Sequence, residues 1–159
     1  MASTKTPRAR KTTTAARTAR KAAAAPAPRA RRLPRGVAGA VRAAFDKKAL
    51  DVVVLDLRKA DGFTDYFVIC TGTSGRQIQA IADGVRTTLK TEFGERPVLA
   101  EGNEKSQWIL IDYFDFVVHV FSRECRDFYA LERLWGNAER QAFSEAPSTA
   151  PSKSPSEAL

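Results

Sequence analysis

Ser74 and His119 are the residues whose types come nearest to nucleophilic catalysis. A serine hydroxyl needs a neighbouring base to become a nucleophile, and the chain contains 1 histidine. Ser74 does not stand in the Gly-x-Ser-x-Gly pattern of hydrolases, and His119 lies in the middle of an apolar, strand-like run. A lone histidine in that setting is more often packed and bonded to a neighbour than catalytic, so the two residues predict no catalytic pair.

The other candidates for chemistry are a glycine-rich turn, two aspartates and two cysteines. Gly72–Gly75 could present a helix N-terminus to a phosphate, but it lacks the lysine and the spacing of a P-loop. Asp112 and Asp115 are three residues apart, which directs them to opposite faces of a continuous strand, whereas acid–base pairs must converge. Cys70 and Cys125 lie outside any Cys or His cluster, which favours reduced thiols over zinc. We therefore expect no enzyme activity, no cofactor and no metal.

Positive charge is concentrated at the N-terminus. Residues 1–36 hold 11 of the 26 lysines and arginines and none of the 18 acidic residues. The remaining 123 residues therefore carry 15 basic and 18 acidic side chains. A basic arm on a mildly acidic body indicates electrostatic attachment to an anionic partner, not a basic nucleic-acid-binding fold.

Composition divides the chain into two tails and one domain. Residues 1–36 and 144–159 contain few large apolar side chains, too few to offset the entropy of ordering, so both are predicted to be disordered. The domain is expected at residues 37–143. Apolar runs reach only about five residues, far below the ~20 of a membrane span, so a soluble protein without a membrane partner is expected. We favour the cytoplasm, although residues 1–36 also resemble a mitochondrial or plastid transit peptide.

Alternating helical and strand-like patterns fill the predicted domain. The runs at 51–57 and 65–72 are nearly continuously apolar, typical of strands covered on both faces. The run at 114–121 alternates, which directs one set of side chains to each face of a sheet. Further strands are expected at 97–99 and 108–111, and helices at 37–45, 74–93 and 123–136. The order predicts an α/β (α+β) domain with a mixed sheet and flanking helices.

Two of the helices carry predictions about individual side chains. Ser74 and Gln77 have the spacing of a capping box, and Gly94 suits a left-handed C-cap. One apolar stripe is expected to be buried: Ile78, Ile81, Ala82, Val85 and Leu89. The last helix is expected to direct three residues inward, namely Phe128, Leu131 and Leu134, with Tyr129 and Trp135 near its flank.

Aromatic and acidic residues are dense around one expected hairpin. It is formed by the strand at 108–112, the connecting Tyr113 and the strand that follows. Trp and Tyr are favoured at the centres of protein interfaces because they supply large rigid area with a polar handle. Core filling is the alternative, and it suits Phe114 and Phe116 better than Trp108 and Tyr113, which stand beside the turn.

The stretch from Lys48 to Arg140 resembles the ribosomal silencing factor family, also called Iojap-like proteins. The motifs that carry the resemblance follow the family's order and cover nearly the whole predicted domain. They are ALDVVVLDLR (49–58), FTDYFVICTGTSGRQIQAIAD (63–83), EG (101–102), WILIDYFDFVVHVFS (108–122) and RDFYALERLWGNA (126–138). The basic tail lies outside this shared region.

The resemblance implies a fold related to nucleotidyltransferases but without their catalytic acidic residues. It implies binding to the large ribosomal subunit through its universal protein fourteen, on the surface that meets the small subunit. A factor bound there would block subunit joining and act as a translational repressor. Organellar relatives imply an alternative function in large-subunit assembly. The resemblance implies nothing about the basic tail; its charge alone predicts a supplementary attraction to ribosomal RNA phosphates.

The resemblance also implies a partner-binding patch. Carried onto this sequence, the family's exposed patch would contain Trp108, Asp112 and Tyr113 of the WILIDY motif. Asp65 and Tyr66 of the TDYF motif would lie nearby. Phe114 is a departure, because the family often has glycine there, and a large aromatic side chain would alter the turn or add contact area.

Overall fold

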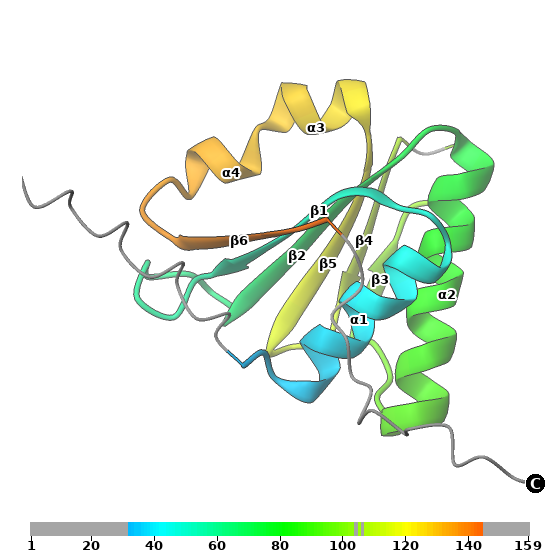
Figure 1. Cartoon of the computed structure of the whole chain (residues 1–159), viewed down its shortest axis with the longest axis horizontal. Coiled ribbons are helices and arrows are strands. Elements are labelled where there is room, and N and C mark those ends of the chain that lie inside the picture. Colours follow the sequence, from blue (N-terminus) through cyan, green and yellow to red (C-terminus); the bar gives the residue numbers. More distant parts are fainter. Residues whose placement is uncertain (1–31, 104, 106, 145–159) are drawn as a thin grey trace, which may run out of the picture. The chain divides into compact units, whose positions relative to one another are not determined.

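Six strands form one mixed sheet with helices on both of its faces (Figure 1). The computed structural model describes residues 32–103, 105 and 107–144. Its strands are β1 (Leu50–Asp56), β2 (Tyr66–Gly72), β3 (Leu99–Glu101), β4 (Trp108–Asp112), β5 (Phe116–Ser122) and β6 (Glu139–Phe143). Its helices are α1 (Arg35–Asp46), α2 (Gly75–Phe93), α3 (Arg123–Tyr129) and α4 (Leu131–Leu134). The predicted mixed α/β class is confirmed.

The sheet has the strand order β3-β4-β5-β2-β1-β6. Its centre is the parallel pair β2 and β5, with Tyr66 opposite Phe116 and Gly72 opposite Ser122. The other neighbours are antiparallel. All seven residues of β2 are buried, as expected for a continuously apolar strand at the centre of a sheet.

Each face of the sheet has its own core. α1 and α2 cover the face that receives Val118 and Val120 of β5. α3 and α4 lie over the face that receives Val117 and Phe121. The alternation predicted along this strand is therefore confirmed, and it decides which side chains can reach which surface.

The predicted caps of α2 are present, with one difference. The Ser74 hydroxyl accepts a hydrogen bond from the Gln77 backbone N–H at 3.1 Å, and Gly94 adopts a left-handed φ of 66°. The Gln77 side chain does not return to Ser74. Its oxygen accepts from the Thr73 N–H at 2.6 Å, and its amide nitrogen donates to the Lys48 carbonyl at 3.0 Å. The five stripe residues predicted to be buried are all buried.

Replacing Ser74 with alanine is expected to lower the free energy of unfolding by about 1 kcal/mol, because the Gln77 N–H loses its acceptor at the helix start. Urea denaturation measures the change. Ser74→Asp keeps an acceptor at the N-cap and should retain most of the stability. Equal stability of the alanine variant and the parent chain would contradict the capping role.

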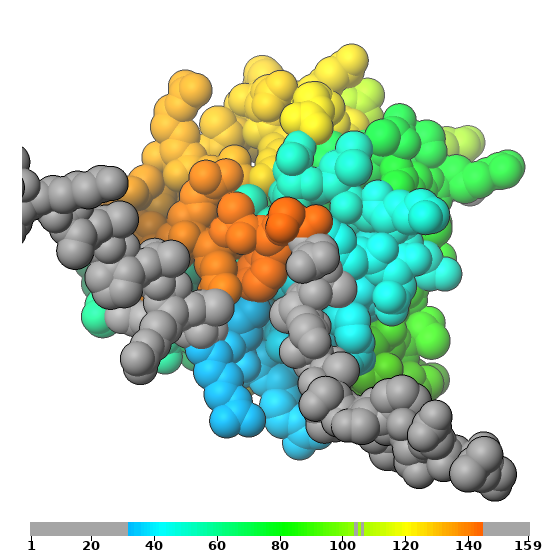
Figure 2. All heavy atoms as spheres, viewed as in Figure 1, coloured from blue at the N-terminus to red at the C-terminus, as the bar shows by residue number. Residues whose placement is uncertain are grey.

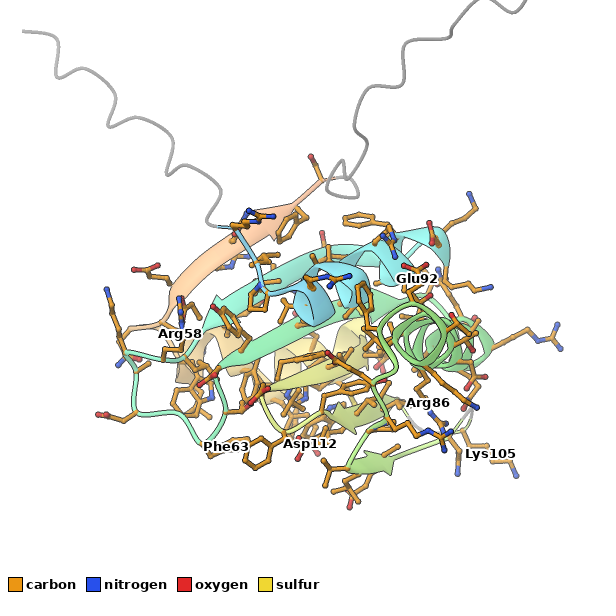
Figure 3. All side chains as sticks on the ribbon, turned by 90° about the horizontal axis from the view of Figure 1, so that it is seen from below. Arg58, Phe63, Arg86, Glu92, Lys105 and Asp112 are labelled. Carbon is orange, nitrogen blue, oxygen red and sulfur yellow. The ribbon has the colours of Figure 1, made fainter. Side chains whose placement is uncertain are left out.

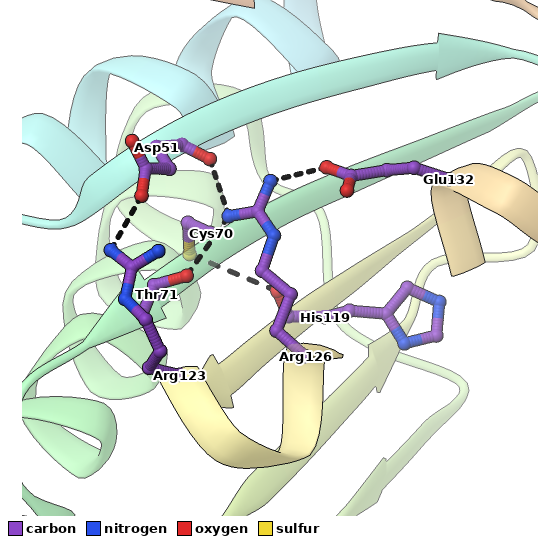
Figure 4. Close-up of polar contacts among 7 residues, drawn as sticks. All are labelled: Asp51, Cys70, Thr71, His119, Arg123, Arg126 and Glu132. Atoms are coloured by element: carbon purple, nitrogen blue, oxygen red, sulfur yellow. Dashed lines mark hydrogen bonds and ion pairs between the residues drawn. The ribbon is translucent and has the colours of Figure 1, made fainter. Parts of the chain in front are cut away.

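A buried arginine ties α3 and α4 to the sheet (Figure 4). Arg126 is 8% exposed, and it donates to the Asp51 carbonyl at 2.6 Å and to the Thr71 hydroxyl at 2.9 Å. The same guanidinium pairs with Glu132. The Asp51 carbonyl is accessible because the β1–β2 register shifts between Leu50 and Val53, a bulge that takes it out of the ladder.

The C-terminal part differs from its prediction. The helix expected at 123–136 is two helices, because Ala130 adopts a left-handed conformation with φ 44° between them. The break changes the direction of the side chains: Phe128 is 81% and Leu134 71% exposed, so their predicted inward positions are wrong. Leu131 does pack on the sheet, as does Trp135, which was expected at the flank.

β6 was absent from the predicted elements. It pairs antiparallel with β1, with Val54 opposite Gln141, and forms an edge of the sheet. In Figure 2 its orange atoms lie between those of the first half of α1, in blue, and those of α3 and α4, in yellow and light orange. Its sequence is largely polar and its residues are exposed or half-buried. The strand therefore has no apolar pattern from which it could be predicted.

The predicted tails lie mostly outside the described residues. Residues 1–31 and 145–159 are not described, so their predicted disorder stays a prediction. The compact unit that contains all described helices and strands begins at Leu33, which packs against the core. α1 begins two residues before the predicted domain start at 37. No helix in the described part of the chain is long and apolar enough to cross a membrane.

Candidate protein-binding surface

On the side of the sheet where α3 and α4 lie, β3 and β4 are only partly covered. Leu99 is 47% exposed, and Trp108 and Leu110 are half-buried. The register places Leu110 opposite His119 and Leu99 opposite Asp112, and directly paired residues share a face of the sheet. We call Leu99, Trp108 and Leu110, together with Phe128 and Tyr129 of α3, the open face.

Trp108 is the most firmly held side chain of the open face. Its indole N–H donates to His119 Nδ1 at 3.1 Å. Its ring stacks on Phe121, with centroids 5.0 Å apart, and meets the Tyr129 ring at 4.6 Å. A half-exposed aromatic residue that is already fixed loses little conformational entropy on binding, which favours it as the anchor of an interface.

His119 is the buried residue that accepts the hydrogen bond of Trp108. Burial lowers the pKa of His119 to about 4, so the imidazole is neutral at pH 7 and its Nδ1 can accept the indole proton. Its Nε2 has no hydrogen-bond partner among the described residues. The Phe67 ring packs edge to face against the imidazole, with the two ring centroids 4.6 Å apart. The interpretation of His119 as a packed residue bonded to a neighbour is confirmed.

Tyr66 and Tyr113 are not on the surface. Each is 7% exposed and belongs to the core beneath α1 and α2. The Tyr113 ring stacks on Phe116 at 4.9 Å, and burial raises the pKa of its hydroxyl to about 12. The predicted exposed patch is therefore wrong for these two tyrosines. For Tyr113 the reason is that side chains alternate between the two faces along an extended chain. Trp108 and Tyr113 are five residues apart, so they point to opposite faces.

The two predicted aspartates lie at a different end of the sheet from Trp108. Asp112 ends β4, and its carboxylate accepts from the Phe114 N–H at 2.8 Å. Asp65 is exposed, and its N–H donates to the Asp115 carbonyl at 3.0 Å. The structure thus brings Asp65 beside the β4–β5 turn, while Trp108 stands at the opposite end of β4.

Phe128 and Tyr129 are surface residues that the sequence placed at or near the core. Tyr129 is 46% exposed and touches both Trp108 and Phe128. Their outward position follows from the left-handed Ala130, and neither glycine nor proline marks that break. No signal in the sequence could have shown it.

The other candidates for chemistry have bonded polar groups. A hollow at the carboxyl ends of β2 and β5 is lined by Gly72–Gly75, Ser122 and Arg123, among others. The hydroxyl of Ser74 caps α2, and the hydroxyl of Ser122 caps α3. Arg123 pairs with Asp51 at 2.7 Å. Among the described residues no group of three or more His, Cys, Asp and Glu could hold a metal. The arrangement suits helix capping and contains no converging acid–base pair.

Comparison with known proteins gives consistent matches. A family described as "Ribosomal silencing factor during starvation" matches residues 30–158. The ribosomal silencing factor of Halalkalibacterium halodurans is 44% identical over 99 residues, covering 62% of this chain and 84% of that protein. A crystal structure from Chromobacterium violaceum has 38% identity and a TM-score of 0.59, covering 71% of this chain and 91% of its own. The chloroplastic protein Iojap of Zea mays is 39% identical, but the match spans only 42% of its length.

Proposed function

Because the chain belongs to the ribosomal silencing factor family, we propose that it binds the large ribosomal subunit and prevents the small subunit from joining. The partner on the subunit would be the universal large-subunit protein fourteen, and the effect would be translational repression. The observation that carries the proposal is the open face, with Trp108 fixed between Phe121 and Tyr129. We place this activity in the cytoplasm.

The chemistry of the open face fits a protein partner. Large aromatic side chains form its centre, and protein interfaces concentrate their binding energy in such residues. Acidic side chains share the same face of the sheet, since Glu101 pairs with Leu110 and Asp112 with Leu99. A partner bearing lysines and arginines would complement them and associate faster.

Subunit joining tests the proposal directly. The purified chain is added in excess to isolated large subunits, small subunits follow, and sucrose gradients separate free subunits from joined ribosomes. We expect co-sedimentation of the chain with large subunits and a loss of joined ribosomes. Normal joining while the chain stays bound would contradict the blocking mechanism.

A role in organellar large-subunit assembly is the second candidate. It is favoured by the similarity to the chloroplastic protein of Zea mays and by the arginine-rich, acid-free composition of residues 1–36. N-terminal sequencing of the native protein distinguishes the two settings. A mature start near residue 36 would favour import, whereas an intact basic segment would favour the cytoplasm.

We further propose that the chain acts without catalysis. The serine hydroxyls at the ends of β2 and β5 already cap helices, and His119 is bonded to Trp108. The fold relation to nucleotidyltransferases that the resemblance implies stays a prediction. Metal-dependent nucleotide binding at micromolar concentration in a titration would contradict a purely non-enzymatic role.

Removing residues 1–32 is expected to weaken binding to large subunits and to flatten its dependence on salt. This segment carries ten lysines and arginines, and each phosphate contact adds about 0.7 to 0.9 to the slope of log K against log salt. Truncation at 32 spares Leu33, which packs on the core. A full-length chain with these ten residues changed to glutamine is the matched control and should behave like the truncation. An unchanged slope would contradict contacts with ribosomal RNA.

A further inference from the structure

Two exposed phenylalanines precede β2 and β5 at the end of the sheet where both strands begin. Phe63 is 76% and Phe114 78% exposed. Their segments are bonded to each other, because the Thr64 hydroxyl donates to the Phe114 carbonyl at 2.9 Å and the Asp65 N–H to the Asp115 carbonyl at 3.0 Å. Figure 3 labels Phe63 and Asp112, which both lie at this end of the sheet. We call Phe63 and Phe114 the aromatic tip.

The backbone at Phe114 is strained. Its φ is 73°, a conformation that suits glycine or asparagine and costs other residues about 1 to 2 kcal/mol. The turn holds it there, because the Asp112 carboxylate accepts from the Phe114 N–H at 2.8 Å and the Phe116 carbonyl accepts from the Tyr113 N–H at 2.9 Å. Backbone geometry therefore gives no reason for an aromatic residue at this position.

Packing gives no reason either. The Phe114 side chain is mostly exposed to solvent. It therefore contributes little to the hydrophobic core of the described residues. Phe63 is likewise mostly exposed, and its ring meets the ring of the buried Phe67 edge to face, with the centroids 5.8 Å apart. Strain at an exposed aromatic residue is a ground for inferring function. Phe114 has this strain, and the exposed Phe63 on the bonded segment adds apolar surface at the same end of the sheet.

The surroundings of the aromatic tip are acidic. Asp61, Asp65 and Asp115 are exposed on the same two segments, and Asp112 lies at the start of the turn. Two exposed cations lie in this loop, Arg58 and Lys59, and the Arg58 guanidinium is paired with Asp56 at 2.7 Å. An apolar projection with an acidic rim complements a basic surface with an apolar pocket.

We propose that the aromatic tip is a second anchor, which inserts Phe63 and Phe114 into a basic protein surface of the large ribosomal subunit. This inference rests on the proposed function. The tip and Trp108 lie at opposite ends of β4, so the two anchors would hold the chain at two points and fix its orientation on the subunit.

Phe114→Asn tests the proposal, because asparagine tolerates the left-handed backbone and removes only the ring. Isolated large subunits are the probe, and sedimentation measures the affinity of the full-length chain. We expect the melting temperature to stay the same or rise by about 4 °C, while affinity falls about 10-fold. Phe114→Tyr should restore binding to within about 3-fold. Phe63→Ser should reproduce the loss without disturbing the turn.

Lys48→Asn is the matched control, because Lys48 is an exposed residue with φ 61° at the other end of the sheet, bonded to the start of α2. It should leave affinity unchanged. Full affinity of Phe114→Asn and Phe63→Ser, with Trp108→Ala impaired, would overturn the second anchor and leave the proposed function standing. Absence of binding by the parent chain would overturn both. A change in oligomeric state in Phe114→Asn, with unchanged subunit affinity, would instead assign the tip to contacts between copies.

Discussion

Trp108→Ala is expected to weaken binding to large ribosomal subunits by about 30-fold or more. Interface residues of this type cost at least about 2 kcal/mol when truncated, and each 1.4 kcal/mol is tenfold in affinity. The loss has two parts. The indole that would fill a pocket on the partner disappears, and Tyr129 and Phe121 lose the ring that they contact. Sedimentation of the chain with large subunits measures the effect.

The substitution also affects the fold, so it needs a matched control. Trp108 is half-buried and bonded to His119, and its removal leaves Nδ1 of a buried imidazole without a donor. Trp135 is half-buried on the same side of the sheet, with its ring centroid 6.1 Å from that of Phe67, but it follows α4 and is not part of the open face. Trp135→Ala should cost similar stability and keep affinity within about 3-fold. Equal losses of affinity in both variants would assign the effect to folding and contradict the anchor.

Arg126→Met is expected to lower the free energy of unfolding by about 3 kcal/mol or more. Methionine keeps much of the volume but leaves the Asp51 carbonyl, the Thr71 hydroxyl and Glu132 without the guanidinium that binds them. Breaking a buried charge pair typically costs about 3 to 5 kcal/mol because the remaining groups stay desolvated. This is a large part of the 5 to 15 kcal/mol that stabilise a typical domain. Urea denaturation gives the value.

Arg123 supplies the control for Arg126. It lies three residues earlier in α3 and pairs with Asp51 at 2.7 Å, yet both side chains are more than half exposed to solvent. Exposed ion pairs contribute about 0 to 1 kcal/mol, so Arg123→Ala should change stability by less than about 1 kcal/mol. Similar losses for the two arginines would mean that burial does not set the strength of these contacts.

Local patterns predicted most of the fold. The stripe from Ile78 to Leu89 and the alternation of Phe116–Phe121 each follow from one period of the backbone, and the structure contains both. The same period would have shown that Trp108 and Tyr113 face opposite ways. The predicted patch is wrong for Tyr66 and Tyr113, which are buried, whereas Trp108 and Asp112 are half-buried and Asp65 is exposed. A motif carried over from a family does not by itself tell which of its residues reach solvent, because a strand directs odd and even positions to opposite faces.

Other features are not local. β6 is polar and becomes a strand because the edge of β1 offers it unpaired backbone groups. Ala130 takes a left-handed conformation that an alanine does not favour by itself, and the bonds of Arg126 to β1, β2 and Glu132 hold the segment around it. The strand β6 and the left-handed Ala130 depend on contacts with segments far away in the chain, so a single sequence does not reveal them.

The sequence by itself determined the family, the class of fold and the basic arm, because these depend on motif order, periodicity and composition. The tertiary structure decided which aromatic residues reach solvent. Trp108 and Tyr113 share one motif, yet one is held half-exposed by His119 and the other is buried beneath α1 and α2. Exposure depends on which face a neighbouring helix covers, and the paths of α3 and α4 are set by contacts between residues far apart in the chain.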